Sequence, residues 1–596
     1  MTAVNPFEQF RSVCATILRD ALSRLYPDVP VPLTLEFPPS AEFGELSSSA
    51  CFELAKSVGK KPLEIAEQIV TAVELTGVPL VQSVKAAGSG YVNFYMNLAE
   101  FSKLALESVL VPSDEYGFVK TEKPLKIIVE HTSANPSHPI HIGTARNSIL
   151  GDSLAQILKA RGHTVYRHYY VDDVGRQSAV MAYGYEKLGQ PEPDGKPDHF
   201  IGQIYAMTNC IIEIQRLKKA VESAKSQGDN EAVAERMREL HDWTAAAVEL
   251  ESAHSQLFNR LLGQISKDKD SDARIAELNL EYERGEKEAV KQLIRKVNTL
   301  CLEGFRQSLE RMDIYCDSWD WESDFVWNGD AARVLMRLGE TPYISHVGEV
   351  LEFSANKVVD DLGLRPQLGL SENYEVPSLT LVRADGTTLY TTRDVAYSLW
   401  KLRKADQVIN VVGMEQTLAQ LHLRIGLAAL KHMDKMKNLK HFTYNLVSLP
   451  GFKMSSRTGR YITLDETMNE AIRRAYEEVA KRSPRLPEEE KKRISNLVGI
   501  GAIKYALVQV DPSKSVVFTW DRVLDFEKNS APYIQYSHAR AGSILRKARR
   551  TPKNPDYALL KEPVERDLII LLARFPEVFV DSAENLRPNQ LADYAN

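Results

Sequence analysis

The pattern of apolar and polar positions between residues 126 and 170 changes from strand to helix and back. Lys126–Glu130 is a short apolar run of β-forming residues, which predicts a buried strand. The next segment carries apolar residues at helical spacing on one face, namely Leu150, Leu154, Ile157 and Leu158. Gly162 predicts the end of that helix, and Thr164–Tyr170 is again rich in β-forming residues. This order predicts the parallel unit of a doubly wound sheet.

The chain before residue 115 has the pattern of a small α/β module. Helical periodicity occurs around Phe7–Leu25 and Ala50–Ala72, and Gly90–Tyr95 alternates like a strand. Later in the chain, Val347–Phe353 and Gln407–Val412 predict that the parallel sheet resumes, the second strand ending at Gly413.

Two other stretches are helical in pattern. Residues from about 185 to 305 are rich in charge, which is more typical of a solvated insertion than of a site. From about residue 485 onward helices are expected at Ile494–Val510, Ser537–Ala548 and Val564–Phe579.

Composition narrows the class of protein. In 596 residues, 44% are hydrophobic and 26% charged, and no apolar run approaches the roughly 18 residues that cross a bilayer. The first residues lack the features of a secretion signal, and the five scattered cysteines suit a reducing cytosol, so we expect a cytoplasmic protein. Because the net charge is −6, any surface that binds nucleic acid must be local.

Two short segments carry candidate chemistry. His141-Ile142-Gly143-Thr144 opens the predicted helix, where unpaired N–H groups and the helix dipole favour phosphate. His141 could donate a hydrogen bond to a phosphate oxygen, or it could simply cap the helix. Lys453-Met454-Ser455-Ser456-Arg457 lies in a Gly/Ser-containing loop far along the chain. An enzyme that binds one triphosphate from two sides would need both of these segments.

Around these segments the chain resembles the class I arginyl-tRNA synthetases. The resemblance is carried, in the family's order, by Glu130–Asn147, Gly151–Leu154, Asp173–Gln177, Leu389–Asp394, Val412–Gln416 and Asn529–Arg540. It covers most of the chain. It implies a Rossmann-like parallel-sheet catalytic domain with an appended N-terminal α/β domain and a C-terminal α-helical anticodon-binding domain.

The resemblance also implies an arginine site. A guanidinium presents five donors in a rigid plane, so its pocket needs carboxylates and other acceptors. The matching positions are Glu130, Ser133, Asn135, Tyr390, Asp394 and Gln416. Asp394 is expected against the guanidinium, with Tyr390 on the same face if a helix begins there. An ordinary helix ion pair between Asp394 and Arg393 is the alternative.

ATP is expected as a substrate, with Mg²⁺ on its phosphates and no metal bound to the protein itself. The implied ATP-binding residues are His141, Gly143, Thr144, Gly413, Met414, Lys453, Met454 and Ser455. His141 and Lys453 lead the catalytic candidates. Thr144 and Ser456 stand where the class usually has a second histidine and a second lysine. His138, only partly charged at its ordinary pKa of about 6.5, Arg457 or Lys453 would then supply the missing charge.

The implied reaction activates L-arginine as its adenylate and transfers it to the terminal 2′-OH of tRNA(Arg). The expected tRNA-binding residues are Tyr533, Gln535, His538 and Arg540. The domains expected on this basis are an N-terminal tRNA-contacting domain over 1–115, a catalytic domain over 120–440, a signature-loop region over 441–485 and an anticodon-binding domain over 486–596. We expect a monomer with no membrane contact.

Two alternatives remain at this point. The family's last helices are expected to extend beyond Asn596, so the anticodon-binding domain is expected to be incomplete. A truncated, inactive paralogue that serves as an RNA-binding or regulatory module is therefore one alternative. An enzyme that adenylates arginine without serving tRNA is the other.

Overall fold

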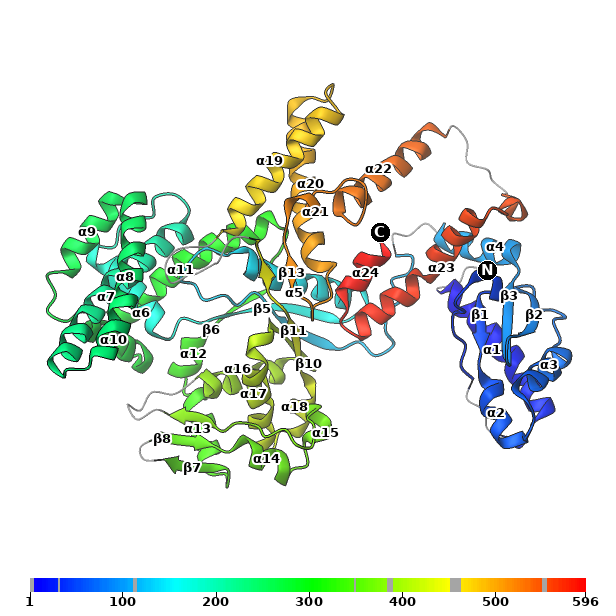
Figure 1. The fold of residues 1–596 in the computed structure, drawn as a ribbon, viewed down its shortest axis with the longest axis horizontal. Coiled ribbons are helices and arrows are strands. Elements are labelled where there is room, and N and C mark those ends of the chain that lie inside the picture. The colour runs from blue at the N-terminus through cyan, green and yellow to red at the C-terminus, as the bar shows by residue number, and fades with distance from the viewer. Residues whose placement is uncertain are drawn as a thin grey trace. The chain divides into compact units, whose positions relative to one another are not determined.

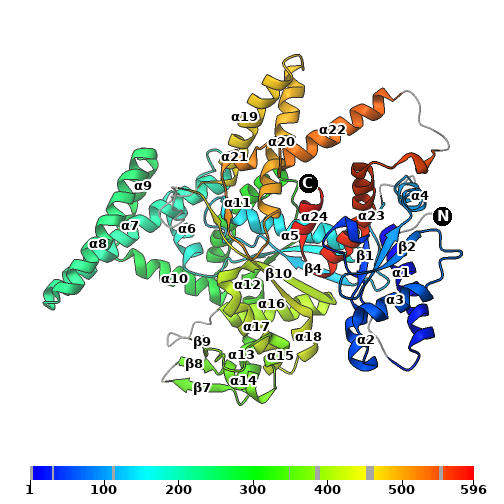
Figure 2. The same cartoon turned by 45° about the vertical axis from the view of Figure 1, so that its right-hand side comes forward.

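The computed structural model describes residues 5–29, 33–110, 115–347, 350–382, 390–450, 462–548 and 555–596. The chain forms two compact units: Met1–Glu122 with Arg540–Tyr594, and Lys123–Ala539 with Ala595–Asn596. Figures 1 and 2 show the elements of each unit.

The larger unit is built on a five-stranded sheet in the order β11-β10-β4-β5-β6, with every neighbouring pair parallel. Its strands are β4 (Lys126–Glu130), β5 (Thr164–Val171), β6 (Ser318–Trp321), β10 (Gln407–Gly413) and β11 (Leu439–Tyr444). The chain starts in the centre at β4, adds β5 and β6 on one side, then returns to add β10 and β11 on the other. The parallel, doubly wound sheet predicted from the sequence is confirmed, and its switch point lies between β4 and β10, where such sheets bind ligands.

Helices bury both faces of this sheet, as its apolar strands require. α5 (Ile142–Ala160) connects β4 to β5, and α16 (Tyr390–Lys404) precedes β10. One apolar cluster joins Ile142 and Ile149 of α5 with Val171 of β5. A second joins Ile128 of β4 with apolar residues of α16 and of α17 (Thr417–Ala429). The sheet thus contributes residues to two separate apolar clusters.

The prediction that Val347–Phe353 belongs to the parallel sheet is wrong. Residues of this segment form β7 (Ile344–Val347) and β8 (Val350–Phe353), which pair antiparallel and continue to β9 (Leu379–Val382) in a separate sheet. Short apolar runs indicate a strand but not its partner, so local pattern could not separate the two sheets.

A helical insertion separates β5 from β6, as the charged periodic sequence predicted. Its helices are α6 (Arg176–Lys187), α7 (Pro197–Ser226), α8 (Asn230–Ala253), α9 (Ser255–Ile265), α10 (Ser271–Arg284) and α11 (Glu288–Arg311). Figure 2 shows the long α7–α8 pair extending away from the sheet. Shorter helices follow β6: α12 (Glu322–Trp327), α13 (Asp330–Gly339), α14 (Ala355–Asp361) and α15 (Arg365–Leu368), and α18 (Met433–Asn438) precedes β11.

After the sheet the larger unit becomes mostly helical. Its elements there are the short parallel pair β12 (Val447–Ser448) and β13 (Val516–Val517), and α19 (Leu464–Arg482), α20 (Glu488–Val508), α21 (Trp520–Val523) and α22 (Ala531–Lys547), whose last residues belong to the smaller unit. α19 pairs closely with α20, and α20 also packs on α5. The helical C-terminal pattern predicted from the sequence is confirmed in this region.

The smaller unit combines the two ends of the chain. Its antiparallel sheet, in the order β1-β3-β2, is formed by β1 (Leu46–Ser48), β2 (Val81–Ala87) and β3 (Tyr91–Met96). The helices are α1 (Pro6–Leu25), α2 (Ala50–Val58), α3 (Pro62–Ala72), α4 (Leu98–Val109), α23 (Pro563–Glu584) and α24 (Pro588–Tyr594). Ile569 and Ala573 of α23 enter the apolar core of the N-terminal elements. The helix expected over Ala50–Ala72 is interrupted at Gly59, which has a left-handed φ of 72°.

Within the described residues, no helix has the length and apolar character needed to span a bilayer.

Candidate active site

α5 begins at the predicted phosphate-binding signature. His141 has extended backbone angles and is the N-cap, and its Nδ1 accepts hydrogen bonds from the backbone N–H groups of Gly143 and Thr144 at 3.1 and 3.3 Å. Because Nδ1 accepts, we assign the proton of the neutral ring to Nε2. The ring therefore caps the helix with one nitrogen and can donate a hydrogen bond with the other. The two roles that the sequence left open are compatible.

The two histidines of this region are neutral in the free protein at pH 7. The His138 and His141 rings stack with centroids 5.6 Å apart. Burial, with a smaller effect of the His138 ring, lowers the pKa of His141 to about 4. Burial also lowers the pKa of His138, although the Pro139 carbonyl and Asp198 act in the opposite direction. His138 is thus less charged than its ordinary pKa suggested, and this end of the site offers neutral donors.

The loop that follows β4 is held in an uncommon backbone conformation. Thr132 and Ser133 have φ values of 69° and 33°, in the left-handed region that β-branched residues in particular avoid. The Thr132 N–H donates to Asn147 Oδ1 at 2.6 Å, and its hydroxyl donates to Ser148 at 3.0 Å. Ser133 Oγ accepts from the Tyr170 N–H at 3.1 Å. α5 and β5 therefore impose a conformation that would cost about 1–3 kcal/mol per residue elsewhere, as often occurs at functional sites.

Glu130, at the carboxyl end of β4, is part of a buried polar network. Its carboxylate pairs with the ammonium of Lys401 on α16, and the Lys401 side chain is 1% exposed. Lys401 also donates to Asn410 Oδ1 at 2.8 Å, and Asn410 in turn donates to Gln420 at 3.0 Å. A buried cation thus fixes Glu130 between the two strands of the switch point. Lys401 lies seven residues after Asp394 and therefore on the same helix face.

Carboxylates outnumber cations around Asp394. The charged groups that act on it include Glu130, Asp172, Arg393 and Lys401. Burial, and to a smaller extent Glu130, raises the pKa of Asp394 to about 7, while Arg393 and Lys401 act to lower it. Arg393 also interacts with a second carboxylate. It lies 3.4 Å from Glu322, which is 1% exposed.

A second pair of carboxyl groups extends the same cluster. Burial raises the pKa of both Asp172 and Glu322, which share a hydrogen bond with each other. Such a hydrogen bond requires a proton on one partner. The cluster of Glu130, Asp172, Glu322 and Asp394, which we call the acidic cluster, therefore favours a cation with several N–H donors.

Aromatic side chains line the strand next to the acidic cluster. The ring of Tyr170 stacks on Tyr397 with centroids 4.3 Å apart, and the Tyr397 hydroxyl donates to Asp320 at 2.7 Å. Asp320 also contacts His168 Nδ1 at 2.6 Å. The Tyr170 hydroxyl is buried and has no hydrogen-bond partner among the described residues. The sequence analysis did not identify any of these residues as part of the site.

Asn135 and Gln416 are the remaining predicted arginine ligands whose side chains the structure describes. Asn135 donates to Gln177 at 3.1 Å, and Gln416 is exposed in the short 3₁₀ turn Met414–Gln416 that follows Gly413. Met414 is 42% exposed, which leaves it accessible to a flat apolar ligand. The Tyr390 side chain and the segment with Lys453, Met454, Ser455, Ser456 and Arg457 lie outside the described residues.

The predicted RNA-contacting residues all lie on α22. Tyr533 is half-buried, and Gln535 donates to the carbonyl of Leu497 on α20 at 3.3 Å. His538 and Arg540 are exposed. His538 and Arg540 are therefore available to a partner.

Arg146 joins the signature helix to the C-terminal helices of the larger unit. Its guanidinium donates to the backbone carbonyls of Asn445, Val510, Asp511 and Lys514 at 2.5–3.2 Å, and the residue is fully buried. Burial lowers its pKa to about 10, which leaves it charged at pH 7. The first turn of α5 is therefore held by the segment that follows α20.

Three family models match the chain. They are the catalytic domain of class I tRNA synthetases (R) at residues 105–308 and 330–520, the arginyl tRNA synthetase N terminal domain at 12–96, and the DALR anticodon binding domain at 534–596.

Individual proteins show the same likeness. An arginine–tRNA ligase of Sulfolobus acidocaldarius is 38% identical over 94% of this chain and 87% of its own length. That of Aeropyrum pernix is 35% identical over 100% of this chain and 91% of its own. Among solved structures, the arginyl-tRNA synthetase of Thermus thermophilus matches with a TM-score of 0.71 and 27% identity, covering 98% of this chain and 90% of that one.

Proposed function

The chain belongs to the class I arginyl-tRNA synthetase family, and on this premise we propose that its crevice at β4 and β10 joins L-arginine to tRNA(Arg) at the expense of ATP. The observation that carries the proposal is that two unlike groups follow the carboxyl end of β4, where Glu130 is the last residue. The acidic cluster around Asp394 suits a guanidinium, and the start of α5 at His141 suits phosphate.

The reaction takes place in two steps. The carboxylate of arginine attacks the α-phosphate of ATP, a bond to the β-phosphate breaks, and pyrophosphate leaves. The 2′-OH of the terminal adenosine of tRNA then attacks the arginyl carbonyl, and AMP leaves. Because charge develops on phosphate oxygens, the protein contributes positioning and preorganised hydrogen-bond donors.

The residues divide between these tasks. Glu130, Ser133, Asn135, Tyr390, Asp394 and Gln416 hold arginine. His141 Nε2 and the N–H groups at the start of α5 bind the phosphates, beside Gly143 and Thr144, while Gly413 and Met414 receive the adenosine. Since burial leaves His138 and His141 neutral, the permanent positive charge comes from Lys453 and Arg457, with Met454, Ser455 and Ser456 completing that segment.

Mg²⁺ accompanies ATP as its phosphate-bound counter-ion. In the part of the chain that the structure describes, one group of side chains has metal-ligand spacing: Asp198, His199 and Asp465. The Lys196 ammonium already lies between its two carboxylates, at 2.9 and 2.7 Å. That group therefore does not suit a divalent ion, and Mg²⁺ is held mainly by phosphate and water.

The tRNA is bound through α22 by Tyr533, Gln535, His538 and Arg540, with residues 1–115 and 486–596 providing further contacts. We place the enzyme in the cytoplasm as a monomer.

The test is pyrophosphate exchange with ATP and L-arginine, with and without tRNA(Arg), beside attachment of labelled arginine to that tRNA. Citrulline, which has the shape of arginine without its charge, is the matched control and is expected to support no exchange. Exchange with arginine and charging of tRNA support the proposal. Equal use of citrulline contradicts the guanidinium site, exchange without charging contradicts transfer to tRNA, and inactivity in both assays contradicts the ligase.

A further inference from the structure

The first turn of α19 contacts the backbone at the start of His141-Ile142-Gly143-Thr144, which we call the first signature. Thr463 is its N-cap and forms a capping box with Glu466. The N–H of Leu464 donates to the carbonyl of Ile140 at 2.7 Å, and Thr463 pairs with His141 in an isolated antiparallel bridge. The start of α19 and the start of α5 therefore have fixed relative positions in this unit.

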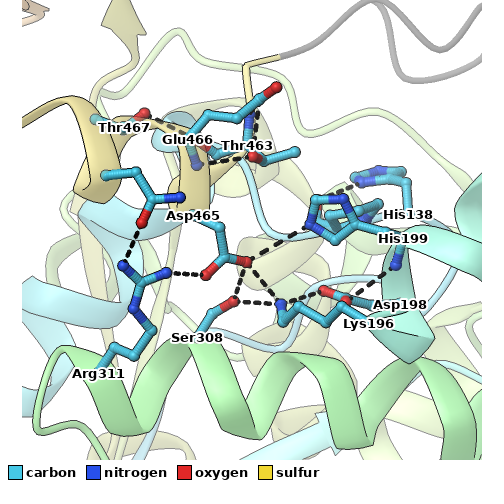
Figure 3. Close-up of polar contacts among 12 residues, drawn as sticks. His138, Lys196, Asp198, His199, Ser308, Arg311, Thr463, Asp465, Glu466 and Thr467 are labelled. Carbon is cyan, nitrogen blue, oxygen red and sulfur yellow. Dashed lines mark hydrogen bonds and ion pairs between the residues drawn. The ribbon is translucent and has the colours of Figure 1, made fainter.

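Asp465, in the same turn, is held by side chains of the helical insertion. Its Oδ2 accepts from Lys196 at 2.7 Å and from Ser308 at 2.8 Å, and its Oδ1 accepts from Arg311 at 2.7 Å. Figure 3 shows these contacts converging on the carboxylate from α11 and from the segment before α7, with His199 close by. The side chain is only 13% exposed. Burial alone would raise the pKa of Asp465, but these donors hold it well below its usual range.

Lys196 is itself fixed by a fully buried carboxylate. Asp198 accepts from Lys196 at 2.9 Å and from the N–H of His199 at 3.0 Å. Gly304 on α11 leaves the space that Asp198 occupies, because a β-carbon at position 304 would overlap the carboxylate. The ammonium thus bridges two buried carboxylates, and α11 is shaped to receive this arrangement.

Arg311 adds a second connection between the same helices. Its other terminal nitrogen donates to Asn469, one turn further along α19, at 2.6 Å. A planar guanidinium that contacts two successive turns restrains both the position and the rotation of a helix. The insertion therefore contacts α19 at the turn whose backbone is bonded to Ile140, the residue before His141.

We propose that Asp465 is a positioning residue for adenylate formation, through which the helical insertion sets the place of the first signature. Asp465 touches neither ATP nor arginine in this proposal. It transmits the position of Lys196, Ser308 and Arg311 to the first turn of α19. The bond from Leu464 to Ile140, and the bridge between Thr463 and His141, transmit it to the donors at the start of α5. The inference depends on the proposed ligase function, because it concerns the rate of that reaction.

The test compares Asp465→Asn and Arg311→Met with the unmodified full-length enzyme, in the presence of tRNA. Active sites are first counted from the burst of arginyl-adenylate, so that unfolded molecules do not enter the rate. We expect pyrophosphate exchange per counted site to fall about tenfold for Asp465→Asn, since small displacements of reacting groups cost up to about 100-fold. The KM for arginine is expected to stay unchanged. Arg311→Met removes a half-exposed side chain, so it is expected to fold and to show a smaller loss of the same kind.

The matched control is Asp268→Asn. Asp268 also accepts hydrogen bonds from a lysine and a hydroxyl, Lys187 and Tyr183 at 2.8 and 2.7 Å, but at a site in the insertion without bonds to α19. We expect it to keep the full rate per counted site.

A double variant separates positioning from mere stability. If Asp465 acts through the first signature, then adding Asp465→Asn to His141→Asn costs little beyond His141→Asn alone. Multiplicative losses, or a normal rate per counted site for Asp465→Asn and Arg311→Met, would overturn the inference. An unmodified enzyme without exchange or charging would instead count against the proposed function.

Discussion

The arginine end and the phosphate end of the candidate active site differ in the kind of group that they present: ionisable side chains at the first and neutral hydrogen-bond donors at the second. At the arginine end, Glu130 and Asp394 lie with Lys401 and Arg393 among buried or half-buried groups, so ionisable side chains are in place before any ligand arrives. At the phosphate end, the neutral ring of His141 accepts a hydrogen bond from the backbone N–H of Gly143. A guanidinium keeps its charge throughout the reaction, whereas the triphosphate is divided. Carboxyl groups that ionise against a cation suit the first ligand, and neutral donors hold phosphate without retaining pyrophosphate.

The largest expected effect is on the buried cation of the arginine end. Lys401→Met leaves Glu130 buried and unpaired, which we expect to cost about 3–5 kcal/mol in the free energy of unfolding. Urea denaturation followed by circular dichroism measures it. Arg403→Met, an exposed change on the same helix, is the control and should cost less than about 0.5 kcal/mol. Equal stabilities of the two variants would contradict the view that Lys401 neutralises Glu130.

Removing the charge of Asp394 should affect one substrate and not the other. Asp394→Asn leaves a bound guanidinium without its carboxylate, and we expect kcat/KM for arginine to fall by about 30- to 1,000-fold, corresponding to about 2–4 kcal/mol. Pyrophosphate exchange at saturating ATP gives this value. The KM for ATP, measured at saturating arginine, is the internal control and should not change. Similar losses for both substrates would mean that the two ends are not independent.

At the phosphate end, two substitutions of His141 separate its two roles. Asparagine can still cap α5 but cannot place a donor where Nε2 lies, so His141→Asn should lower kcat by roughly 10- to 100-fold at little cost in stability. His141→Ala should show the same loss of rate and also lose about 1 kcal/mol of stability. Exchange rates per counted site and thermal unfolding together provide the measurement. A normal rate for His141→Asn would reduce the residue to a helix cap.

Lowering the pH should weaken the binding of arginine. The pKa of Asp394 is raised to about 7 in the free protein, and a bound guanidinium favours the ionised form, so binding releases a proton. Below pH 7 the Kd for arginine should therefore increase up to about tenfold per pH unit, and between pH 7 and 8 it should level off. Calorimetric titration in two buffers of different ionisation enthalpy measures both the Kd and the released proton. A Kd that is constant from pH 5.5 to 8 would exclude this linkage.

The contrast also explains what the sequence could reveal. The sheet and the helix that begins at His141 follow from local pattern, because periodicity determines them, whereas the place of Asp394 was implied by the resemblance to the family. Lys401 and Glu322 were missed, and so was the contact of Arg393 with Glu322, because these roles arise where distant elements meet. The same holds for Val347–Phe353, whose partner strand no local signal specifies, and for α23, which packs on the N-terminal core. Long-range pairing is thus the part of this fold that pattern alone could not supply.

The smallest expected effect is an absence of titration at the phosphate end. Burial lowers the pKa of His141 to about 4 and also lowers that of His138. The His141 ring of the free protein should therefore take up no proton between pH 8 and pH 6, and the His138 ring should titrate below its ordinary pKa of about 6.5. Histidine ring signals in NMR spectra, assigned by comparison with His141→Asn and His138→Gln, measure this directly, and a histidine model peptide provides the reference curve. If either ring titrates near pH 6.5, that end carries a switchable charge, and the division between a charged arginine end and a neutral phosphate end fails. If both stay neutral, the cation for the transition state has to come from elsewhere, and substitution of Lys453 or Arg457 becomes the decisive next experiment.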